Sequence, residues 1–390
     1  MKRPWTLGLL ALASCAASVA ATDPRFPGNA TFSTLTTTTL AIEGLTGDPQ
    51  GNLYATGRAA GNGVPCPIWR IAVGSPTPVV VGQVPAPSAS ASCSPSGLAF
   101  GPDGRLYLSE ADKVYRVSPD AAAPALATVF ASGVTGTNGL AFDLHGNLWT
   151  GDGTTGLGRV WKITRSGVVS EVFRIQPMAN PAGVGRVHST VPATVTNPTA
   201  GGPLLANPQP LVANGLAFNL NREGELFVAD TARGAIWRVN FNRQGQLVSP
   251  VGCDTTFTAN TLCLSNVWVA HPQLEGADGI ALDQGGNVWV AGNERNAIVV
   301  VTTEGRVIEI FRNPPDATTG LRNAGPLETP TSPYLLNDLL CTANSDGNRR
   351  DNSPATAGEI GGTGQPRGKV SCMNPRLTIP GLPLPVRGLQ

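Results

Sequence analysis

Several short segments of the chain repeat one arrangement, in which an oxygen-bearing residue stands just before a glycine and an apolar run. "PSGLAF" begins at residue 95, "TNGLAF" at 137, "ANGLAF" at 213 and "ADGIAL" at 277. The glycine and the apolar residues barely change, whereas the residue before the glycine varies among side chains that carry oxygen. With a first copy, "EGLTGD", and a weaker sixth, "SPYLLNDLL", the repeated position is occupied by Glu43, Ser96, Asn138, Asn214, Asp278 and Ser332.

Carboxylate and amide oxygens at one site are the ligands that calcium prefers, since it accepts six to eight hard oxygens. Glu43 and Asp278 would repel each other in a narrow channel, and a divalent cation would balance their charge. No His or Cys occupies the repeated position, which disfavours zinc and copper. We therefore expect Ca²⁺, or another hard cation such as Mg²⁺ or Mn²⁺, with Ser96 and Ser332 lining the channel. The alternative is that these residues only form turns around channel waters.

The elements around these positions repeat as well. Each copy is an apolar run, a Gly-bearing turn and an alternating run, as in "SGLAFGPDGRLYLSE" and "NGLAFDLHGNLWTGD", and further strand-like runs follow. Four short antiparallel strands at intervals of several tens of residues are typical of propeller blades. The sequence predicts an all-β, six-bladed β-propeller over residues 22–390, with the Thr-rich stretch 31–42 pairing with the last blade to close the ring. The first strand of each blade would bring the repeated position to the central channel.

Composition limits the partners. The formal net charge of +1 over 390 residues offers no basic field for nucleic acid. No run after the N-terminus is long and apolar enough for a transmembrane helix. We expect a monomer that binds a small molecule.

The N-terminal residues have the pattern of an export signal, with Lys2 and Arg3, a short apolar stretch and then small residues. Cleavage after Ala20 or Ala21 would release a periplasmic or secreted protein. The segment "LASC" also resembles a lipobox, so that cleavage before Cys15 would leave a lipid anchor there. Both alternatives predict export.

Setting Cys15 aside leaves an even number of cysteines, which in an exported chain indicates disulfides. Sequence neighbours suggest three pairs: Cys66 with Cys93, Cys253 with Cys263, and Cys341 with Cys372. The alternative is six buried free thiols. Metal binding by cysteine is disfavoured because no CxxC occurs.

The order Glu, Asn, Asn, Asp across successive copies, each followed by glycine, resembles the SMP-30/gluconolactonase family and its relative diisopropyl fluorophosphatase. The segment "ADGIALDQGGNVWVA" at 277–291 is especially similar. The resemblance implies a six-bladed calcium-dependent hydrolase, in which Glu43, Asn138, Asn214 and Asp278 hold the cation. It also implies that Asp278 is the base or nucleophile in hydrolysis of a lactone, ester or phosphotriester.

One departure puts a sugar lactone in doubt, because Gly136 stands where such members carry an arginine. The histidines His188 and His271 fall on connections that face the expected site and are candidate substrate contacts. The blades also resemble NHL repeats, many of which only bind partners. The alternative function is therefore a non-enzymatic binding or scaffold propeller with a structural calcium.

Overall fold

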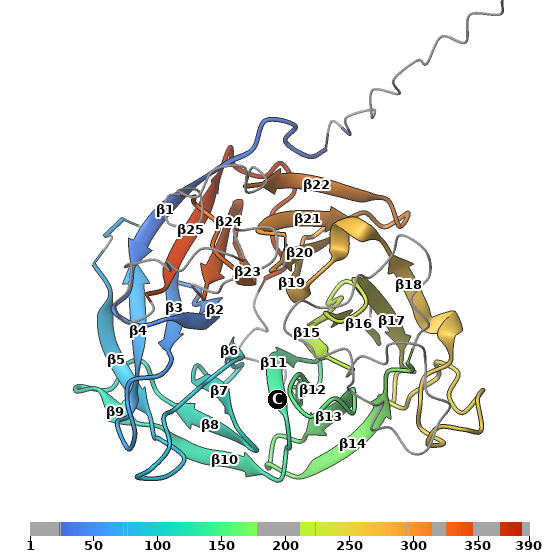
Figure 1. Cartoon of the computed structure of the whole chain (residues 1–390), viewed down its shortest axis with the longest axis horizontal. Helices are drawn as coiled ribbons and strands as arrows, with labels where there is room; N and C mark the ends of the chain where they lie inside the picture. Colours follow the sequence, from blue (N-terminus) through green and yellow to red (C-terminus); the bar gives the residue numbers. More distant parts are fainter. Residues whose placement is uncertain are drawn as a thin grey trace, which may run out of the picture.

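The computed structural model describes residues 23, 25–72, 74–75, 77–177, 211–222, 224–293, 295–313, 325–345 and 367–383. The export signal, Cys15 and His188 lie outside these residues. Six antiparallel sheets surround a central axis in the order of the sequence (Figure 1), which confirms the predicted six-bladed propeller. The described residues contain only two short 3₁₀ turns besides strands, η1 (Leu264–Asn266) and η2 (Pro272–Leu274).

Each blade runs from an inner strand at the axis to an outer strand at the rim. The first three blades contain β2 (Ile42–Gly47), β3 (Asn52–Gly57), β4 (Cys66–Ala72) and β5 (Val79–Val84); β6 (Leu98–Phe100), β7 (Leu106–Glu110), β8 (Lys113–Val117) and β10 (Thr128–Ser132); and β11 (Thr137–Phe142), β12 (Leu148–Asp152), β13 (Arg159–Ile163) and β14 (Val169–Arg174). A short strand, β9 (Ala125–Leu126), adds to the first blade in parallel with β5.

The last three blades follow the same order. They contain β15 (Ala213–Phe218), β16 (Glu225–Asp230), β17 (Ala235–Asn240) and β18 (Val267–Ala270); β19 (Ala277–Leu282), β20 (Val288–Gly292), β21 (Ala297–Val301) and β22 (Val307–Arg312); and β23 (Pro330–Leu336), β24 (Leu339–Asn344), β25 (Lys369–Asn374) and β1 (Thr31–Thr37). Second and third strands such as β20 and β21 are buried on both faces, because each blade is covered by its neighbours. The apolar core therefore lies between the blades.

The ring is closed by the two ends of the chain. β1 pairs antiparallel with β25, from Thr31 opposite Asn374 to Thr37 opposite Lys369. This pairing confirms that the Thr-rich N-terminal stretch completes the last blade. It also removes an unpaired strand edge that would otherwise be open to aggregation.

A recurring turn fixes the first hairpin of several blades. In the third blade, Asp143 accepts hydrogen bonds from the backbone nitrogen of Asn147 (2.8 Å) and from Trp149 Nε1 (2.9 Å). In the fifth blade, Asp283 accepts from Asn287 N (3.0 Å) and Trp289 Nε1 (3.0 Å). The indole nitrogens are thus satisfied where the rings are buried, which explains why Gly-Asn-x-Trp recurs after these aspartates.

A C-terminal strap, residues 377–383, crosses the face on which these turns lie. The backbone nitrogen of Gly381 donates to Asn337 O (2.7 Å), and that of Leu382 donates to Leu282 O (3.1 Å). Leu382 lies at the end of the axial channel, which has a volume of about 180 Å³. The channel wall there is mostly apolar and is contributed by all six inner strands, including Leu45, Leu98, Leu140, Leu216, Ile280 and Pro333.

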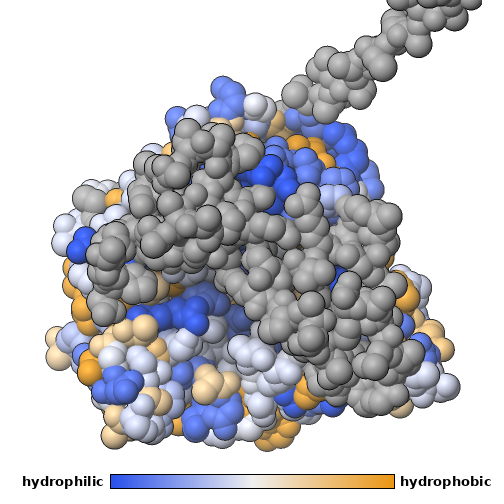
Figure 2. All heavy atoms as spheres, viewed as in Figure 1, coloured by the Kyte–Doolittle hydropathy of each residue, from blue (hydrophilic) through white to orange (hydrophobic). Residues whose placement is uncertain are grey.

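All three predicted disulfides are present, joining Cys66 to Cys93, Cys253 to Cys263 and Cys341 to Cys372. Cys341 on β24 lies opposite Cys372 on β25, the strand that pairs with the ring-closing strand β1. Among the described residues, none of the helical segments has the length and apolarity needed to span a bilayer. Figure 2 shows hydrophilic residues in the recess near the centre of the visible face and scattered apolar residues at its edges.

Candidate metal centre

In five of the six blades, the inner strands approach one another so closely near their starts that only glycine fits. A Cβ built on Gly139 would lie 2.6 Å from the Asn214 carbonyl oxygen, and one built on Gly215 would lie 2.5 Å from that of Asp278. The same applies to Gly44, whose Cβ would lie 2.6 Å from the Ser96 carbonyl oxygen. The residue before each glycine therefore lies beside its counterpart in the next blade. The repeated polar position forms a continuous ring around the axis.

In the sixth blade, the ring member is Thr331 and not the predicted Ser332. Gly279 packs against the carbonyl oxygen of Thr331 and the Cα of Ser332. Thr331 thus occupies the place of Asn138 or Asp278, and Ser332 occupies the place of the glycine that follows them. The hydroxyl of Thr331 donates to the Glu43 carbonyl oxygen (2.7 Å) and so joins the sixth blade to the first.

In four blades, the residue that follows the second strand contacts the ring member of the same blade. Thr231 Oγ1 accepts a hydrogen bond from Asn214 Nδ2 (3.1 Å) and donates to Ala277 O (2.6 Å). Gly153 packs so tightly against the side-chain amide nitrogen of Asn138 that a Cβ there would clash. Because both amide nitrogens face the second strand, the amide oxygens are the atoms left for a ligand at the axis.

Asn293 holds Asp278 in the same way. Its Nδ2 donates to Asp278 Oδ2 at 2.6 Å, and both residues are buried. This charge-assisted bond fixes one oxygen of the carboxylate and therefore sets its orientation. Asn293 follows β20 directly, as Thr231 follows β16. Asn293 was not among the predicted site residues, although its place after the "VWVAG" strand gives the signal.

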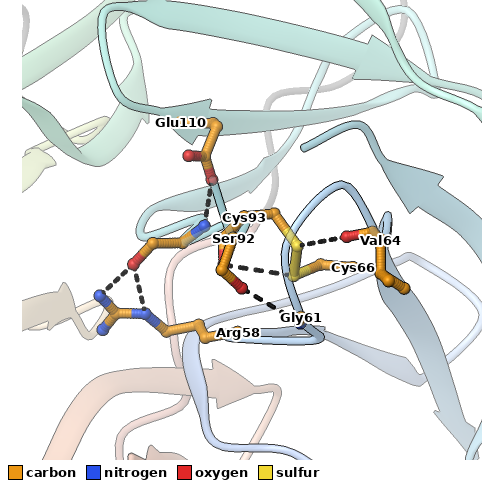
Figure 3. The surroundings of a disulfide bond; sticks show 8 residues. Arg58, Gly61, Val64, Cys66, Ser92, Cys93 and Glu110 are labelled. Atoms are coloured by element: carbon orange, nitrogen blue, oxygen red, sulfur yellow. Dashed lines mark hydrogen bonds between the residues drawn. A yellow bond between two sulfur atoms is a disulfide. The ribbon is translucent and has the colours of Figure 1, made fainter. Parts of the chain in front are cut away.

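Glu43 has a cationic neighbour that the sequence analysis also missed. Arg58, the residue after β3, forms an ion pair with Glu43 through Nη1 and Oε2. Its other nitrogens donate to Ser94 Oγ, from Nε at 3.1 Å and from Nη2 at 2.6 Å. Figure 3 shows this guanidinium beside the segment that the disulfide anchors through Cys93.

Glu110 supports the same segment from the second blade. Its Oε2 accepts from the backbone nitrogen of Ser94 (2.7 Å), as Figure 3 shows. Burial raises the pKa of the Glu110 carboxyl above its ordinary value, against the lowering effect of the Ser94 hydrogen bond and of the Arg58 charge. The disulfide, Ser94 and Glu110 thereby fix the position of Arg58 over Glu43.

The donor set fits a hard cation. The ring supplies two carboxylates, from Glu43 and Asp278, and two amide oxygens, from Asn138 and Asn214. No group of three or more His, Cys, Asp or Glu comes together in the described part of the chain. A cation in the ring must therefore use the amide oxygens as well as the carboxylates, and this oxygen-only set suits calcium better than zinc. Ser96 belongs to the same ring and is buried.

Gly136 does not leave room for a side chain. Its φ is +81°, and the Asp152 carboxylate lies against its Cα. Arg159 binds that carboxylate through Nε (2.8 Å), and its Nη2 donates to Thr135 O (3.3 Å). An arginine guanidinium therefore lies beside Gly136, but it comes from β13.

His271 begins the 3₁₀ turn η2 that leads to β19. Its Nδ1 accepts a hydrogen bond from the backbone nitrogen of Gln273 (3.2 Å). Burial, together with the charge of Arg295, holds the pKa of this imidazole below its ordinary value. Nδ1 of His271 is thus occupied as a cap of the turn.

The comparisons with known proteins agree with this fold. Residues 193–326 match the family model described as SMP-30/Gluconolactonase/LRE-like region. This range includes Asn214 and Asp278 and confirms the resemblance inferred from the sequence. No curated protein sequence matches the chain significantly.

Solved structures of similar fold cover most of the chain at low identity. A calcium-binding regucalcin from Agrobacterium tumefaciens is 16% identical, with a TM-score of 0.54 over 93% of this chain and 97% of its own. A gluconolactonase from Xanthomonas campestris is 16% identical, with a TM-score of 0.50 over 92% and 91%. A PQQ-bound aldose sugar dehydrogenase from Streptomyces coelicolor is also 16% identical, with a TM-score of 0.55 over 90% and 100%. These structures show the propeller fold alone.

Proposed function

We propose that this protein is an exported, calcium-dependent hydrolase that acts on a lactone, ester or phosphotriester bond of a small molecule. The observation that carries the proposal is the ring of oxygen ligands at the axis, in which Asn293 orients the buried carboxylate of Asp278 at 2.6 Å. The family match over Asn214 and Asp278 supports the lactonase-like class.

Glu43, Asn138, Asn214 and Asp278 would hold the cation. Bound there, it would polarise the carbonyl or phosphoryl oxygen of the substrate and stabilise the negative charge that develops on it. A hydrolytic water or a carboxylate nucleophile is still needed. Asp278 is the candidate, because its orientation is fixed and it lies on the ring.

Asp278 would act either as a base that takes the proton of an attacking water or as the attacking nucleophile. Arg58 would add a positive charge beside the reacting group. With Glu43 and Asp278 together carrying two negative charges, Arg58 and a divalent cation would leave the site net positive. Such a site favours a substrate on which negative charge accumulates during the reaction.

Calorimetric titration of the EDTA-treated protein with calcium tests the first half of the proposal. We expect one saturable site, which is lost in Glu43→Gln. A panel of lactones, aryl esters and phosphotriesters then tests turnover, which we expect to be abolished in Asp278→Asn. Asp254→Asn is the matched control, since the Asp254 carboxylate bonds only to Thr256 among the described residues, in the segment between β17 and β18. No calcium binding at millimolar concentration refutes the proposal.

The ion pair between Arg58 and Glu43 favours a second function. Arg58 already balances the charge of Glu43, so this carboxylate does not need a catalytic cation as its counter-charge. The protein would then be a non-enzymatic binding or scaffold propeller in which calcium only stiffens the core. Calcium binding with no turnover of any panel substrate supports this function over the hydrolase.

Export is part of the proposal and has its own measurement. Mass spectrometry of the mature N-terminus distinguishes a chain cut after Ala20 or Ala21 from one lipidated at Cys15. Sedimentation of the purified protein tests the proposed monomer. An intact, unmodified N-terminus on protein from the producing cells contradicts export.

A further inference from the structure

A second cavity lies on the face of the propeller opposite the metal ring. Its volume is about 760 Å³, within the range of small-molecule sites. Its wall comes from the β2–β3 turn, the β23–β24 turn, the segment after β8 and the C-terminal strap. Since the ring residues stand at the opposite ends of the inner strands, this cavity is separate from the candidate metal centre.

The C-terminal strap forms one side of the cavity. Gly381 and Leu382 line it, and backbone hydrogen bonds to Asn337 O (2.7 Å) and Leu282 O (3.1 Å) hold these two residues in place. Leu382 and Tyr334 also line the apolar axial channel, which adjoins the cavity. An apolar group in the cavity therefore has a continuous apolar wall that leads toward the axis.

The acidic groups of the cavity are poorly suited to hold a ligand. Each oxygen of Asp48 already accepts two hydrogen bonds within its own turn: Oδ1 from the backbone nitrogens of Gln50 and Asn52 (both 2.9 Å), and Oδ2 from Asn52 Nδ2 (2.7 Å) and Tyr54 Oη (2.8 Å). Asp120 is exposed, so water screens its charge.

Arg70 is the group that lacks a partner. It lies on β4 opposite Tyr54, is half-buried and lines the cavity. Its guanidinium makes no ion pair or hydrogen bond with any residue that the structure describes. A guanidinium has five donors in a planar fork that matches a carboxylate, sulfonate or phosphate. A ligand that covers Arg70 must supply acceptors to it.

We propose that this cavity binds a small amphipathic anion, with its acidic group on Arg70 and its aromatic or aliphatic body against Phe100, Tyr334 and Leu382. The cavity wall has an apolar part and a cationic part, as such a ligand requires. The strap and the channel end provide the apolar surface, and Arg70 provides the only cationic side chain among the residues that line the cavity.

The test uses the full-length protein and two fluorescent probes of similar shape. The anionic probe is 8-anilinonaphthalene-1-sulfonate, and the neutral probe is N-phenyl-1-naphthylamine. We expect saturable 1:1 binding of the anionic probe, weakened about tenfold in Arg70→Met, which keeps the apolar stem of the side chain. Binding of the neutral probe should be the same in the wild type and the variant.

Three variants make the result specific. Arg105→Ala, which removes an exposed arginine paired with Asp103 on the same face, should leave both probes unaffected. Leu382→Trp should weaken binding of both probes, because it changes the apolar wall against which they lie. Asp278→Asn and EDTA should change neither, which separates this site from the candidate metal centre. Melting temperatures confirm that the variants are folded.

Equal affinity of the anionic probe for the wild type and Arg70→Met overturns the proposal. So does the lack of saturable binding to the folded wild type. Affinities of both probes that are unchanged in Leu382→Trp also overturn it, since the probes would then lie elsewhere.

Discussion

Arg58 forms an ion pair with Glu43, the carboxylate that the sequence assigns to a cation. The side chain of Glu43 is only 13% exposed and that of Arg58 30%, so water screens the pair incompletely. The ring therefore has a positive charge beside it, and a cation bound at the ring would lie close to Arg58. Several properties of the protein follow from this arrangement and from the hydrogen bonds around it.

Replacing Arg58 by Met should tighten calcium binding. Two unit charges about 4 Å apart interact by about 1 to 4 kcal/mol in a partly screened site, so we expect calcium affinity to increase by at least about fivefold. Calorimetry on the EDTA-treated proteins measures it. Arg105→Met is the control, because Arg105 lies on the opposite face. An unchanged or weakened affinity in Arg58→Met would mean that Glu43 does not bind the cation.

Asn293→Ala should reduce turnover more than it reduces calcium binding. The lost bond to Asp278 is charge-assisted and buried, and such bonds contribute about 1.5 to 3 kcal/mol. We expect kcat on the panel substrate to fall about 10- to 100-fold. Asn221→Ala, which breaks an exposed bond to the Gln284 carbonyl oxygen, is the matched control. Wild-type kcat in Asn293→Ala would show that orientation of Asp278 is unimportant.

Asp283→Ala should destabilise the fold strongly and leave calcium affinity unchanged. Asp283 is fully buried, and its loss leaves the indole nitrogen of Trp289 and the amide of Asn287 without their acceptor. We expect a loss of about 2 to 4 kcal/mol in the free energy of unfolding, measured in urea.

Asp103→Ala is the comparison for that variant. Asp103 occupies a similar turn and accepts from Tyr107 Oη (2.9 Å), but it is exposed. Its loss should cost less than about 1 kcal/mol. Equal losses of unfolding free energy in Asp283→Ala and Asp103→Ala would show that burial of the aspartate does not determine how much the turn stabilises the fold.

Asp230 should make stability fall as the pH rises from about 4 to 6. Burial raises the pKa of this carboxyl from 3.8 to about 6, against the opposing effect of the Arg233 charge. The folded state thus binds more protons than the unfolded state in this window. Asp230 contributes fully to the free energy of unfolding below its pKa in the unfolded chain. This contribution, at most about 3 kcal/mol, is lost as the pH rises through its pKa in the folded state.

Asp230→Asn removes this titration. The free energy of unfolding of the wild type relative to the variant should therefore decline between pH 4 and 6 and stay constant above pH 7. Urea unfolding at several pH values measures the difference. A relative stability that rises with pH over the same window would show that the pKa is lowered in the folded state.

The fold was predictable because the blades repeat. The copies can be aligned by the Gly after the polar residue and by the Trp or Tyr after the turn, and this alignment locates the strands of each blade. The closing strand was predicted from the Thr-rich stretch before Glu43. The sixth blade lacks the glycine, and Ser332 stands where the other copies have it. Without that marker, the assignment moved by one residue and missed Thr331.

The surroundings of the site were harder to predict. Arg58 and Asn293 both follow a second strand, so they share one structural position, but their residue types differ and no pattern connects them in the sequence. The C-terminal strap has no strand periodicity, and its contacts depend on turns far away in the chain, such as that of Asn337. Repetition predicts the blades, whereas contacts that occur once must be found in the structure.

The pairing of Thr31 with Asn374 has a consequence for how the molecule forms. The two residues are 343 positions apart, so the last blade cannot be completed until nearly all of the chain has been synthesised. Before then, five blades with an open edge would be exposed to other chains and to proteases. Both ends of the chain must therefore be available before the molecule gains its full resistance to unfolding.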